Sequence, residues 1–495
     1  MSTTSPSAAG DVRTAARAVP GRVMITGLGV VSGLGVGQAA FWAGLTEGRS
    51  ALRPIIRFDA TKFAASVGAQ ITDASGKDFS ARDLVPKHYR KAVKVMARDI
   101  EIAVAAARLA VEDAGLVTRG TLPEDSTDPT TYPSDRVGCH IGAGLIAAET
   151  DELTAALATA RTPEGRFEMK RWGTIPPGAS GGAGGGAGDG SAALPVGGMN
   201  NLTPLWMLKY LPNMLACHVT IIHGAEGPSN TITAAQASGM LSMGESARAI
   251  ERGAADLCFS GGAESKLNLM GLLRAQFAGR LATSGAAEGA SVVRPFDPAS
   301  KGTLIGEGGA ILILEDASTA KARGATIYAE IAGFGAGQSG PAPTVLGEDE
   351  PELAALSLGE FDDGLANAIT AALADAKISP AEIDAIVPLG LGVPALDRAE
   401  ATSLQRVFGA KLAEIPLITL TPFVGDAYAG QGSLQVAAGA LAIRHQMLPA
   451  RLHAGTPANG LQAGAAPARP ARLRNVLVCA PAQGGQNAAL VLRAP

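Results

Sequence analysis

The sequence is poor in charged and aromatic residues, and it lacks a long uninterrupted apolar run. Charged residues make up 17% of the 495 positions and aromatic residues 4%, and the formal net charge is −4. So low a charge excludes nucleic-acid binding driven by bulk electrostatics. No apolar run of 18 residues is free of both glycine and charge, so no membrane span is predicted.

Cysteine is scarce, and its spacing argues against a disulfide framework. Cys139, Cys217, Cys258 and Cys479 lie far apart, without a CxxC pair, in apolar segments that we expect to form strands. Isolated cysteines of this kind usually pack as small apolar side chains. We therefore expect reduced core thiols in a cytoplasmic protein, with no metal site and no bound cofactor.

Apolar residues, in contrast, are abundant at 47% of the chain, enough for two or three domains and a large core. Short apolar runs alternate with helical patterns, which indicates a parallel or mixed α/β architecture. Residues 1–21 are rich in alanine, serine and threonine, and we expect a disordered tail there, with a transit peptide as the alternative. Residues 173–198 are rich in glycine, which predicts a flexible loop.

Local patterns also place individual elements. The apolar residues between 93 and 111 fall at helical spacing, and Gly115 should end that helix. Ser379 with Glu382 is a capping box before an apolar run. The segment 22–29 has a weak counterpart at 328–335, and the segment 256–264 has one at 475–485. Such echoes fit a chain built from two similar halves.

The most informative motif is the run from Gly227 to Met240, GPSNTITAAQASGM, with Gln236 at its apex. Small residues on both sides permit a tight turn. The run resembles the nucleophile elbow of the β-ketoacyl synthases, the thiolase-fold condensing enzymes of fatty acid and polyketide assembly. Their elbow holds a cysteine at the N-terminus of a buried helix, whose dipole favours the thiolate. A glutamine amide cannot become a thiolate, so the scaffold is kept while the nucleophile is lost.

Further motifs resemble the same family in the same order, at Arg22–Gly37, Arg136–Gly144, Leu211–Asn230, Asp256–Ser265 and Arg294–Gly335. The resemblance implies a thiolase-like α/β fold, in which two similar halves form α/β/α/β/α layers. These halves would span 22–316 and 325–495. The family carries a loop near the dimer face and substrate entrance where residues 173–198 fall, although a tolerated surface insertion is the other interpretation.

The resemblance also implies positions for two catalytic histidines, a lysine and a gating phenylalanine. The first histidine position holds Leu389 and the second holds Asp426, while Thr421 lies near the lysine position. The phenylalanine position holds Gln483. The glycines that flank these positions still align with the family motifs, although each catalytic side chain is replaced. We therefore expect no catalytic residue, and a vestigial site made of Gln236, Leu389, Asp426 and Gln483.

The remaining reactive side chains offer no replacement. None of the six histidines lies in either catalytic loop. His218 and His223 flank apolar residues, which favours packing in the core or at an interface. Cys217 lies in the same segment and not on a turn, so it is a poor nucleophile candidate.

Relatives with glutamine at the elbow suggest two functions. Some decarboxylate malonyl groups, but the enolate oxyanion of that reaction needs donors whose individual loss costs about 10²- to 10³-fold in rate, and both histidines are missing. Others are inactive chain-length factors, which pair with a ketosynthase and help shape its acyl tunnel. We predict a chain-length-factor-like subunit of a heterodimeric ketosynthase. The alternatives are a decarboxylase or a synthase with relocated chemistry, and a stand-alone acyl or carrier binder.

A basic cluster suggests a partner. Lys87, Lys91, Lys94 and Arg98 are spaced four, three and four residues apart, with Arg90 adjacent, which would put them on one side of a helix. A solvated helix face is the ordinary interpretation. The cluster PKHYRK also resembles the segment with which family members bind acidic acyl carrier protein. On that interpretation Lys87, Arg90 and Lys91 dock the carrier.

Family dimers pair through the strand that leads to the elbow, and the resemblance places that strand at Leu215–Gly224. The segment is apolar and β-branched, so an exposed edge there would invite aggregation unless it were covered. Cys217, Val219 and Ile221 are therefore expected at an obligate interface. The partner would be a cysteine-bearing ketosynthase or a second copy of the chain.

Overall fold

The computed structural model describes residues 21–495 apart from 74, 151–152, 154–156, 158–159, 170–171, 173–205, 284–288, 341–362, 454–455 and 458–459. The expected glycine-rich loop and, except for Gly21, the expected tail lie outside the described residues. Within the described residues, no helix is long and apolar enough to cross a membrane.

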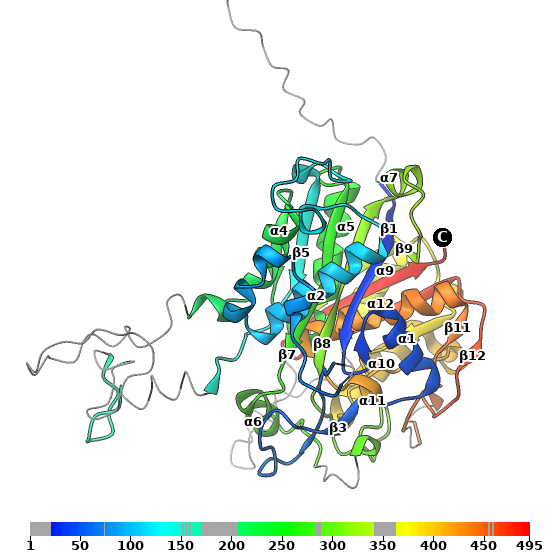
Figure 1. The fold of residues 1–495 in the computed structure, drawn as a ribbon. Helices are drawn as coiled ribbons and strands as arrows, with labels where there is room; N and C mark the ends of the chain where they lie inside the picture. Colours follow the sequence, from blue (N-terminus) through cyan, green and yellow to red (C-terminus); the bar gives the residue numbers. More distant parts are fainter. Residues whose placement is uncertain are drawn as a thin grey trace, which may run out of the picture.

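A mixed sheet runs through the molecule (Figure 1) and holds ten strands in the described part of the chain. One side consists, in spatial order, of β1 (Val23–Ser32), β8 (Glu307–Asp316), β7 (Leu257–Ser265), β5 (Val137–Gly142) and β6 (Ser229–Ile232), with β2 (Gly35–Val36) paired to β1. Beyond β1 the sheet continues through β9 (Ala329–Gln338), β14 (Gln486–Arg493), β13 (Asn475–Pro481) and β10 (Ala385–Val387). Two small sheets pair β3 (Leu52–Pro54) with β4 (Val67–Ala69), and β11 (Met447–Leu448) with β12 (Arg469–Pro470).

The strand directions repeat about the boundary between β1 and β9. On one side β1 pairs antiparallel with β8, β8 antiparallel with β7, and β7 parallel with β5. On the other side β9, β14, β13 and β10 repeat the same sequence of directions. The sequence echoes fall on equivalent strands, β1 with β9 and β7 with β13. This repetition is the duplicated architecture that the sequence predicts.

Helices cover the outer faces of both halves of the sheet, and two further helices pack between the halves. The outer helices α2 (Arg98–Asp113) and α4 (Met214–His223) lie on the first half, where α2 crosses β1 and β8 (Figure 1). The inner helices α5 (Ser238–Glu251) and α12 (Gln431–His445) contact strands of both halves. The outer helices α9 (Asp363–Asp375) and α10 (Pro394–Phe408) cover the second half. The expected α/β/α/β/α layers are therefore present.

The described part of the chain also contains the helices α1 (Gln38–Glu47), α6 (Leu269–Phe277), α7 (Ala317–Ala322) and α11 (Thr421–Val424). Every residue of β1, β7 and β8 is buried, as expected for strands covered on both faces. Close packing of α5 on β5 requires glycine at 142, because a Cβ there would lie 2.4 Å from the backbone nitrogen of Gly239.

Local predictions differ in their outcome. The capping box of Ser379 and Glu382 is confirmed, on a 3₁₀ turn before β10. The helix predicted to include Val93 begins only at Arg98, because Ala92–Val95 forms a separate 3₁₀ turn that ends at Met96 in extended conformation. Three of the cysteines lie in strands as expected, but Cys217 lies in α4.

The largest correction concerns Leu215–Gly224, which we expected to be an edge strand. It forms the helix α4, ended by Gly224 in the left-handed region at φ 68°. Leu215, Val219 and Ile222 are buried at helical spacing against α2 and β5. The β-branched residues favour a strand, but packing of the apolar stripe against the rest of the core stabilises the helix. The strand that leads to the elbow is the short β6 at the end of the sheet.

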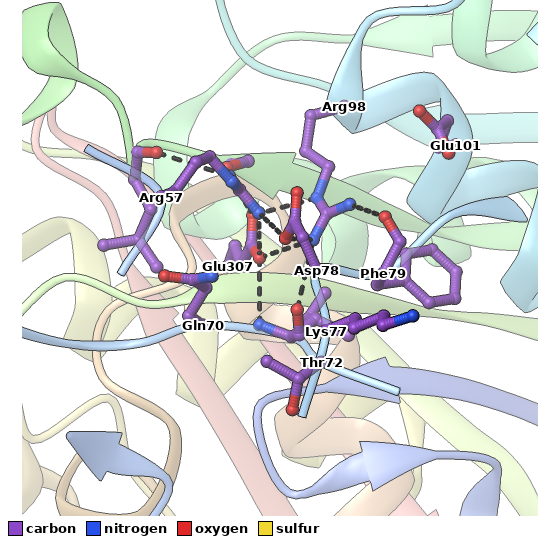
Figure 2. A network of polar contacts seen from close by, with 12 residues as sticks. Arg57, Gln70, Thr72, Lys77, Asp78, Phe79, Arg98, Glu101 and Glu307 are labelled. Carbon is purple, nitrogen blue, oxygen red and sulfur yellow. Dashed lines mark hydrogen bonds and ion pairs between the residues drawn. The ribbon is translucent and has the colours of Figure 1, made fainter. Parts of the chain in front are cut away.

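A buried carboxylate ties the start of α2 to the sheet (Figure 2). The Glu307 side chain, fully buried at the start of β8, accepts hydrogen bonds from the guanidinium groups of Arg57 and Arg98. Ile71 N and Ser265 Oγ donate to the same carboxylate at 2.9 and 2.7 Å. Burial would raise the pKa of the Glu307 carboxyl, but Arg98 and Arg57 hold it at about 2. This cluster fixes where α2 begins.

Candidate functional site

The elbow has the predicted strand, turn and helix. β6 leads into a 3₁₀ turn over Ala235–Ala237, and α5 begins at Ser238. Gln236 lies on this turn and is fully buried. Ala235, just before it, has φ 43°, a conformation that non-glycine residues rarely adopt. Ser238 Oγ holds the turn by accepting from Ala234 N at 2.8 Å and donating to Ala235 O at 2.7 Å.

Asp426 lies directly beside Gln236. Gln236 Nε2 donates to Asp426 Oδ2 at 2.8 Å, and Tyr428 N donates to Asp426 Oδ1 at 2.9 Å. Burial raises the pKa of the Asp426 carboxyl to about 6, against the opposing effect of these two hydrogen bonds. At neutral pH the group is therefore mostly a carboxylate.

The loop that carries Leu389 is held by two buried carboxylates of α10. Glu400 accepts from Leu389 N at 2.8 Å and from Gly390 N at 2.9 Å. Asp397 Oδ2 accepts from Phe296 N at 2.7 Å and from Gly392 N at 3.0 Å. Burial raises the pKa of the Asp397 carboxyl to about 7, although these backbone donors lower it.

Sequence reasoning missed both of these carboxylates. Their signal is visible afterwards, because Asp397 lies in the first turn of a helix that follows a glycine-containing loop. Acidic side chains at helix N-termini often bind backbone N–H groups. Thr421, at the expected lysine position, donates its hydroxyl to Leu389 O at 3.2 Å.

A small pocket brings Gln236, Leu389 and Gln483 together. Asp426 touches it only through Gln236. The other lining residues are Gly340, Leu391, Leu396, Asp397, Ala399, Glu400, Pro481, Ala482 and Gly485. Among the described residues that line the pocket, none carries a thiol, hydroxyl or imidazole group. The pocket therefore has acceptors and apolar walls but no nucleophile.

The histidines nearest the elbow serve packing, as the sequence suggests. His218 Nδ1 lies 2.7 Å from the Tyr89 hydroxyl, and His223 Nδ1 lies 2.8 Å from the Thr118 hydroxyl. Burial lowers the pKa of His223 to about 3 and also lowers that of His218. Both imidazoles are neutral and hydrogen-bonded on α4, and neither lines the pocket.

A second buried polar cluster, unexpected from the sequence, lies behind the elbow. Glu264 accepts from Ala429 N at 2.8 Å and pairs with Lys266, whose Nζ also donates to Leu145 O at 2.6 Å. Burial and the neighbouring Glu264 carboxylate raise the pKa of Asp99 to about 7. In the described part of the chain, no cluster of three or more His, Cys, Asp or Glu side chains could hold a metal ion.

The basic cluster is only partly the stripe that the spacing predicts. Lys87, Lys91 and Lys94 are exposed, but they lie on two separate 3₁₀ turns. Arg90 is half-buried and lies 3.5 Å from Asp83. Arg98 does not belong to the stripe, because its guanidinium is bound to Glu307 (Figure 2). The spacing of basic residues in the sequence does not show whether a side chain is exposed to solvent or, like that of Arg98, bound in the interior.

The three residues expected at a dimer interface differ in burial on α4. Val219 is fully buried in the core, Cys217 is partly buried, and Ile221 is 64% exposed. Ser229 and Asn230 of β6 are exposed at the end of the sheet. Leu145, which follows β5, is 60% exposed. Ile221 and Leu145 are therefore exposed apolar residues, whereas Val219 belongs to the core.

Comparisons with known proteins agree with this geometry. Residues 21–320 match the model of the β-ketoacyl synthase N-terminal domain, and residues 328–455 match that of the C-terminal domain. A granaticin polyketide putative β-ketoacyl synthase 1 of Streptomyces violaceoruber is 30% identical over 478 residues, covering 96% of this chain and 98% of the relative. A tetracenomycin polyketide synthase ketoacyl synthase β subunit of Streptomyces glaucescens is 30% identical over 481 residues, with the same coverage.

Among solved structures, the ishigamide ketosynthase/chain length factor is 27% identical and has a TM-score of 0.73, covering 96% of this chain and 100% of that one. The matched family models, the full-length relatives and the elbow geometry all agree with the resemblance seen in the sequence. The chain therefore belongs to the β-ketoacyl synthase family.

Proposed function

We propose that this chain is a non-catalytic, chain-length-factor-like subunit that pairs with a cysteine-bearing ketosynthase in polyketide or fatty acid synthesis. The observation that carries the proposal is the elbow itself. Gln236 occupies the nucleophile position in a fully folded strand, turn and helix, while its amide is engaged with Asp426. A glutamine amide cannot carry an acyl thioester, so a partner must supply the nucleophile.

The relatives support a role in a pair. One of them is named as the β subunit of a ketoacyl synthase, and one similar structure is named as a ketosynthase/chain length factor. The exposed end of β6 and the exposed Ile221 offer a surface for association. An obligate interface in this position should bury more than about 2,000 Å². The expected place of such a complex is the cytoplasm.

The charge of the site disfavours the decarboxylase alternative. Asp397 and Glu400 line the pocket and Asp426 lies behind Gln236. A malonyl carboxylate would enter a site that already holds three buried acidic groups, without a histidine to stabilise the enolate. A synthase with relocated chemistry is disfavoured because the pocket lining offers no nucleophile among its described residues.

We further propose that Lys87, Arg90 and Lys91 dock the acyl carrier protein. Two of these side chains are exposed, and the short turns that carry them lead directly into the start of α2, which the Glu307 cluster anchors. A rigid, locally basic segment can attract an acidic partner even when the whole chain has a net charge of −4.

Co-expression tests the subunit proposal. The chain is expressed with a cysteine-bearing ketosynthase encoded in the same genome, and the assembly is weighed by native mass spectrometry. We expect a one-to-one heterodimer that condenses acyl and malonyl thioesters, with the acyl group found only on the partner cysteine. A stable homodimer without affinity for any synthase, or a monomer that binds the carrier alone, would contradict the proposal and favour the stand-alone binder.

A further inference from the structure

Basic residues gather where α12 ends. Arg444 and His445 lie in the last turn of this helix, and Gln446 follows in the left-handed region at φ 48°. The next strand, β11, pairs with β12, so that Leu448 lies opposite Arg469. Figure 1 shows this small sheet at the right edge of the molecule, on the opposite side from α4. The helix end and the small sheet therefore form a surface of the second half.

The side chain of Gln446 holds the segment after β12 against the end of α12. Its Nε2 donates to Leu473 O at 2.8 Å, and its Oε1 accepts from Leu473 N at 3.0 Å. Gln446 O also accepts from Ala471 N at 2.9 Å. Arg472 lies between these two anchored residues, and Arg474 follows them. Three hydrogen bonds thus fix the backbone that carries the arginines, which lowers the entropic cost of binding a partner.

Four arginines of this surface are exposed and form no ion pair or hydrogen bond through their side chains with a described residue. We call them the arginine patch: Arg444, Arg469, Arg472 and Arg474. Their charges act on neighbouring cationic groups. Burial and the nearby Arg469 lower the pKa of Arg451, and burial and Arg444 lower the pKa of His445. The patch is therefore a site of uncompensated positive charge.

The acidic side chains beside the patch are engaged by other groups. Asp384 Oδ2 accepts from the backbone nitrogens of Arg474 and Asn475 at 2.7 and 2.9 Å. Glu382 interacts with the charge of Arg474, but its carboxylate accepts from Ser379 N at 2.9 Å. Two carboxylates do not balance four guanidinium groups, so a net positive charge remains.

The dipole of α12 explains only part of the patch. Basic side chains at a helix C-terminus compensate the negative end of the dipole, and Arg444 has this place on α12. Arg469, Arg472 and Arg474 lie on β12 and in the segment after it, so the dipole does not account for them. Like charges that lie close together destabilise a fold. A partner that brings negative charge would relieve this repulsion.

The surroundings of the patch favour an acidic protein segment over other anions. Among the described residues between 444 and 474, no large apolar side chain is exposed, so the patch has no group to insert into a membrane. The net charge of −4 opposes the approach of a nucleic acid. Guanidinium groups pair bidentately with carboxylates. Trp42, stacked on His445 at 5.1 Å, adds a partly exposed aromatic surface beside the charges.

We propose that the arginine patch binds a short acidic segment of a partner protein. The carboxylates of that segment pair with the four guanidinium groups, and its backbone crosses the end of α12. This assignment goes beyond the proposed subunit function, because the elbow pocket, α4 and the segment 87–91 contribute no residue to the patch.

The test titrates the full chain at low salt with fluorescein-labelled hexaglutamate, with labelled hexaglutamine and with a short DNA duplex. We expect saturable binding of hexaglutamate that weakens as salt is added, and no saturable binding of hexaglutamine. The duplex should bind at least about tenfold more weakly than hexaglutamate.

Substitutions locate the site. A triple variant with Arg469→Gln, Arg472→Gln and Arg474→Gln should bind hexaglutamate at least about tenfold more weakly. The matched control makes the same change in net charge at three exposed positions elsewhere, Lys62→Gln, Lys77→Gln and Arg274→Gln, and should change the affinity less than about twofold. Circular dichroism checks that both variants keep the fold.

Four results would overturn the proposal. The first is no saturable binding of hexaglutamate, and the second is equal affinity in the patch variant and the control. Tighter binding of the duplex than of hexaglutamate, lost in the patch variant, would assign the patch to nucleic acid. Weaker binding of acyl carrier protein by the patch variant would assign the patch to the carrier site.

Discussion

Gln236 Nε2 and Asp426 Oδ2 lie 2.8 Å apart although 190 residues separate them in the chain. The resemblance assigns one residue to the nucleophile position of the first half and the other to a histidine position of the second half. The two side chains are complementary, because the Gln236 amide donates and the Asp426 carboxylate accepts. The two residues form a structural contact between the halves, and we therefore predict that one substitution alone does not produce reactivity.

Gln236→Cys tests this conclusion directly. We expect the variant to form no acyl-enzyme and to show no condensation above background, because Asp426 would disfavour the thiolate and Leu389 cannot stabilise an oxyanion. Intact-mass analysis after exposure to acyl-carrier thioester provides the readout. The partner synthase, acylated under the same conditions, serves as the positive control. A stoichiometric acyl adduct on the variant would show that the second-half positions are wrongly assigned.

Asp426 should leave a signature in the pH dependence of stability. Its pKa is raised to about 6 in the fold, whereas an unfolded aspartate titrates near about 3.9. The folded chain therefore binds more protons than the unfolded chain between these values, so this contribution to stability falls as pH rises through that window. Asp426→Asn should remove it, a change on the order of 2–3 kcal/mol.

Urea unfolding of the wild type and of Asp426→Asn, at a series of pH values between about 4 and about 7, measures this difference. We expect the variant to gain stability relative to the wild type as pH rises. Asp125→Asn, at an exposed position, should follow the wild type throughout. Parallel curves for the wild type and Asp426→Asn would mean that the Asp426 carboxyl titrates normally.

The Glu307 cluster should be decisive for stability. Arg98→Met leaves the buried carboxylate with Arg57 as its only guanidinium partner, and loss of one partner from a buried ion pair costs about 3–5 kcal/mol. Lys94→Met removes a similar charge from a nearby exposed position and should cost less than about 0.5 kcal/mol. Thermal and urea unfolding of both variants provide the comparison. Similar stability of the two variants would assign Arg98 to the surface stripe after all.

Charge reversal tests carrier docking. Replacing Lys87, Arg90 and Lys91 by glutamate should weaken binding of acidic acyl carrier protein and slow its association, more strongly at low salt. Stopped-flow association at two salt concentrations measures both effects.

A matched control reverses three basic residues elsewhere on the surface, Lys321, Lys377 and Arg472, all exposed. It produces the same change in net charge and should affect association much less. If both triple variants slow association equally, the carrier responds to total charge and the segment 87–91 is only a solvated face.

Val219 and Ile221 should respond differently to the same substitution. Val219→Asp places a charge in the core and should prevent folding, because an unpaired buried carboxylate is very costly. Ile221→Asp lies on the exposed side of α4 and should leave the fold intact while abolishing assembly. Circular dichroism and native mass spectrometry separate the two effects. Val95→Asp, at an exposed apolar residue away from α4, is the control, and full assembly by Ile221→Asp would remove this residue from the interface.

The elbow could be predicted because the run from Gly227 to Met240 resembles the family motif, and its small residues permit the tight turn. It fails at Leu215–Gly224, where β-branched residues mimic a strand and only packing against α2 reveals the helical period. Asp397 and Glu400 were missed because their partners are backbone N–H groups, and only Asp397, in the first turn of α10, has a signal in the sequence. Arg98 was misplaced because Glu307, its partner, lies 209 residues away.

The boundary between the duplicated halves carries one more consequence. The start of β1 pairs directly with β9, with Val23 opposite Ile331, Met24 opposite Glu330 and Ile25 opposite Ala329. The Arg22 guanidinium donates from Nη2 to Glu330 Oε2 at 2.6 Å. The two similar halves therefore share one hydrogen-bonded sheet, and we expect that the connection between residues 316 and 325 does not act as a hinge. Separation of β1 from β9 would expose unpaired backbone N–H and C=O groups, and such a strand edge favours aggregation. Because backbone pairing joins the two halves, we expect them to unfold as a single cooperative unit.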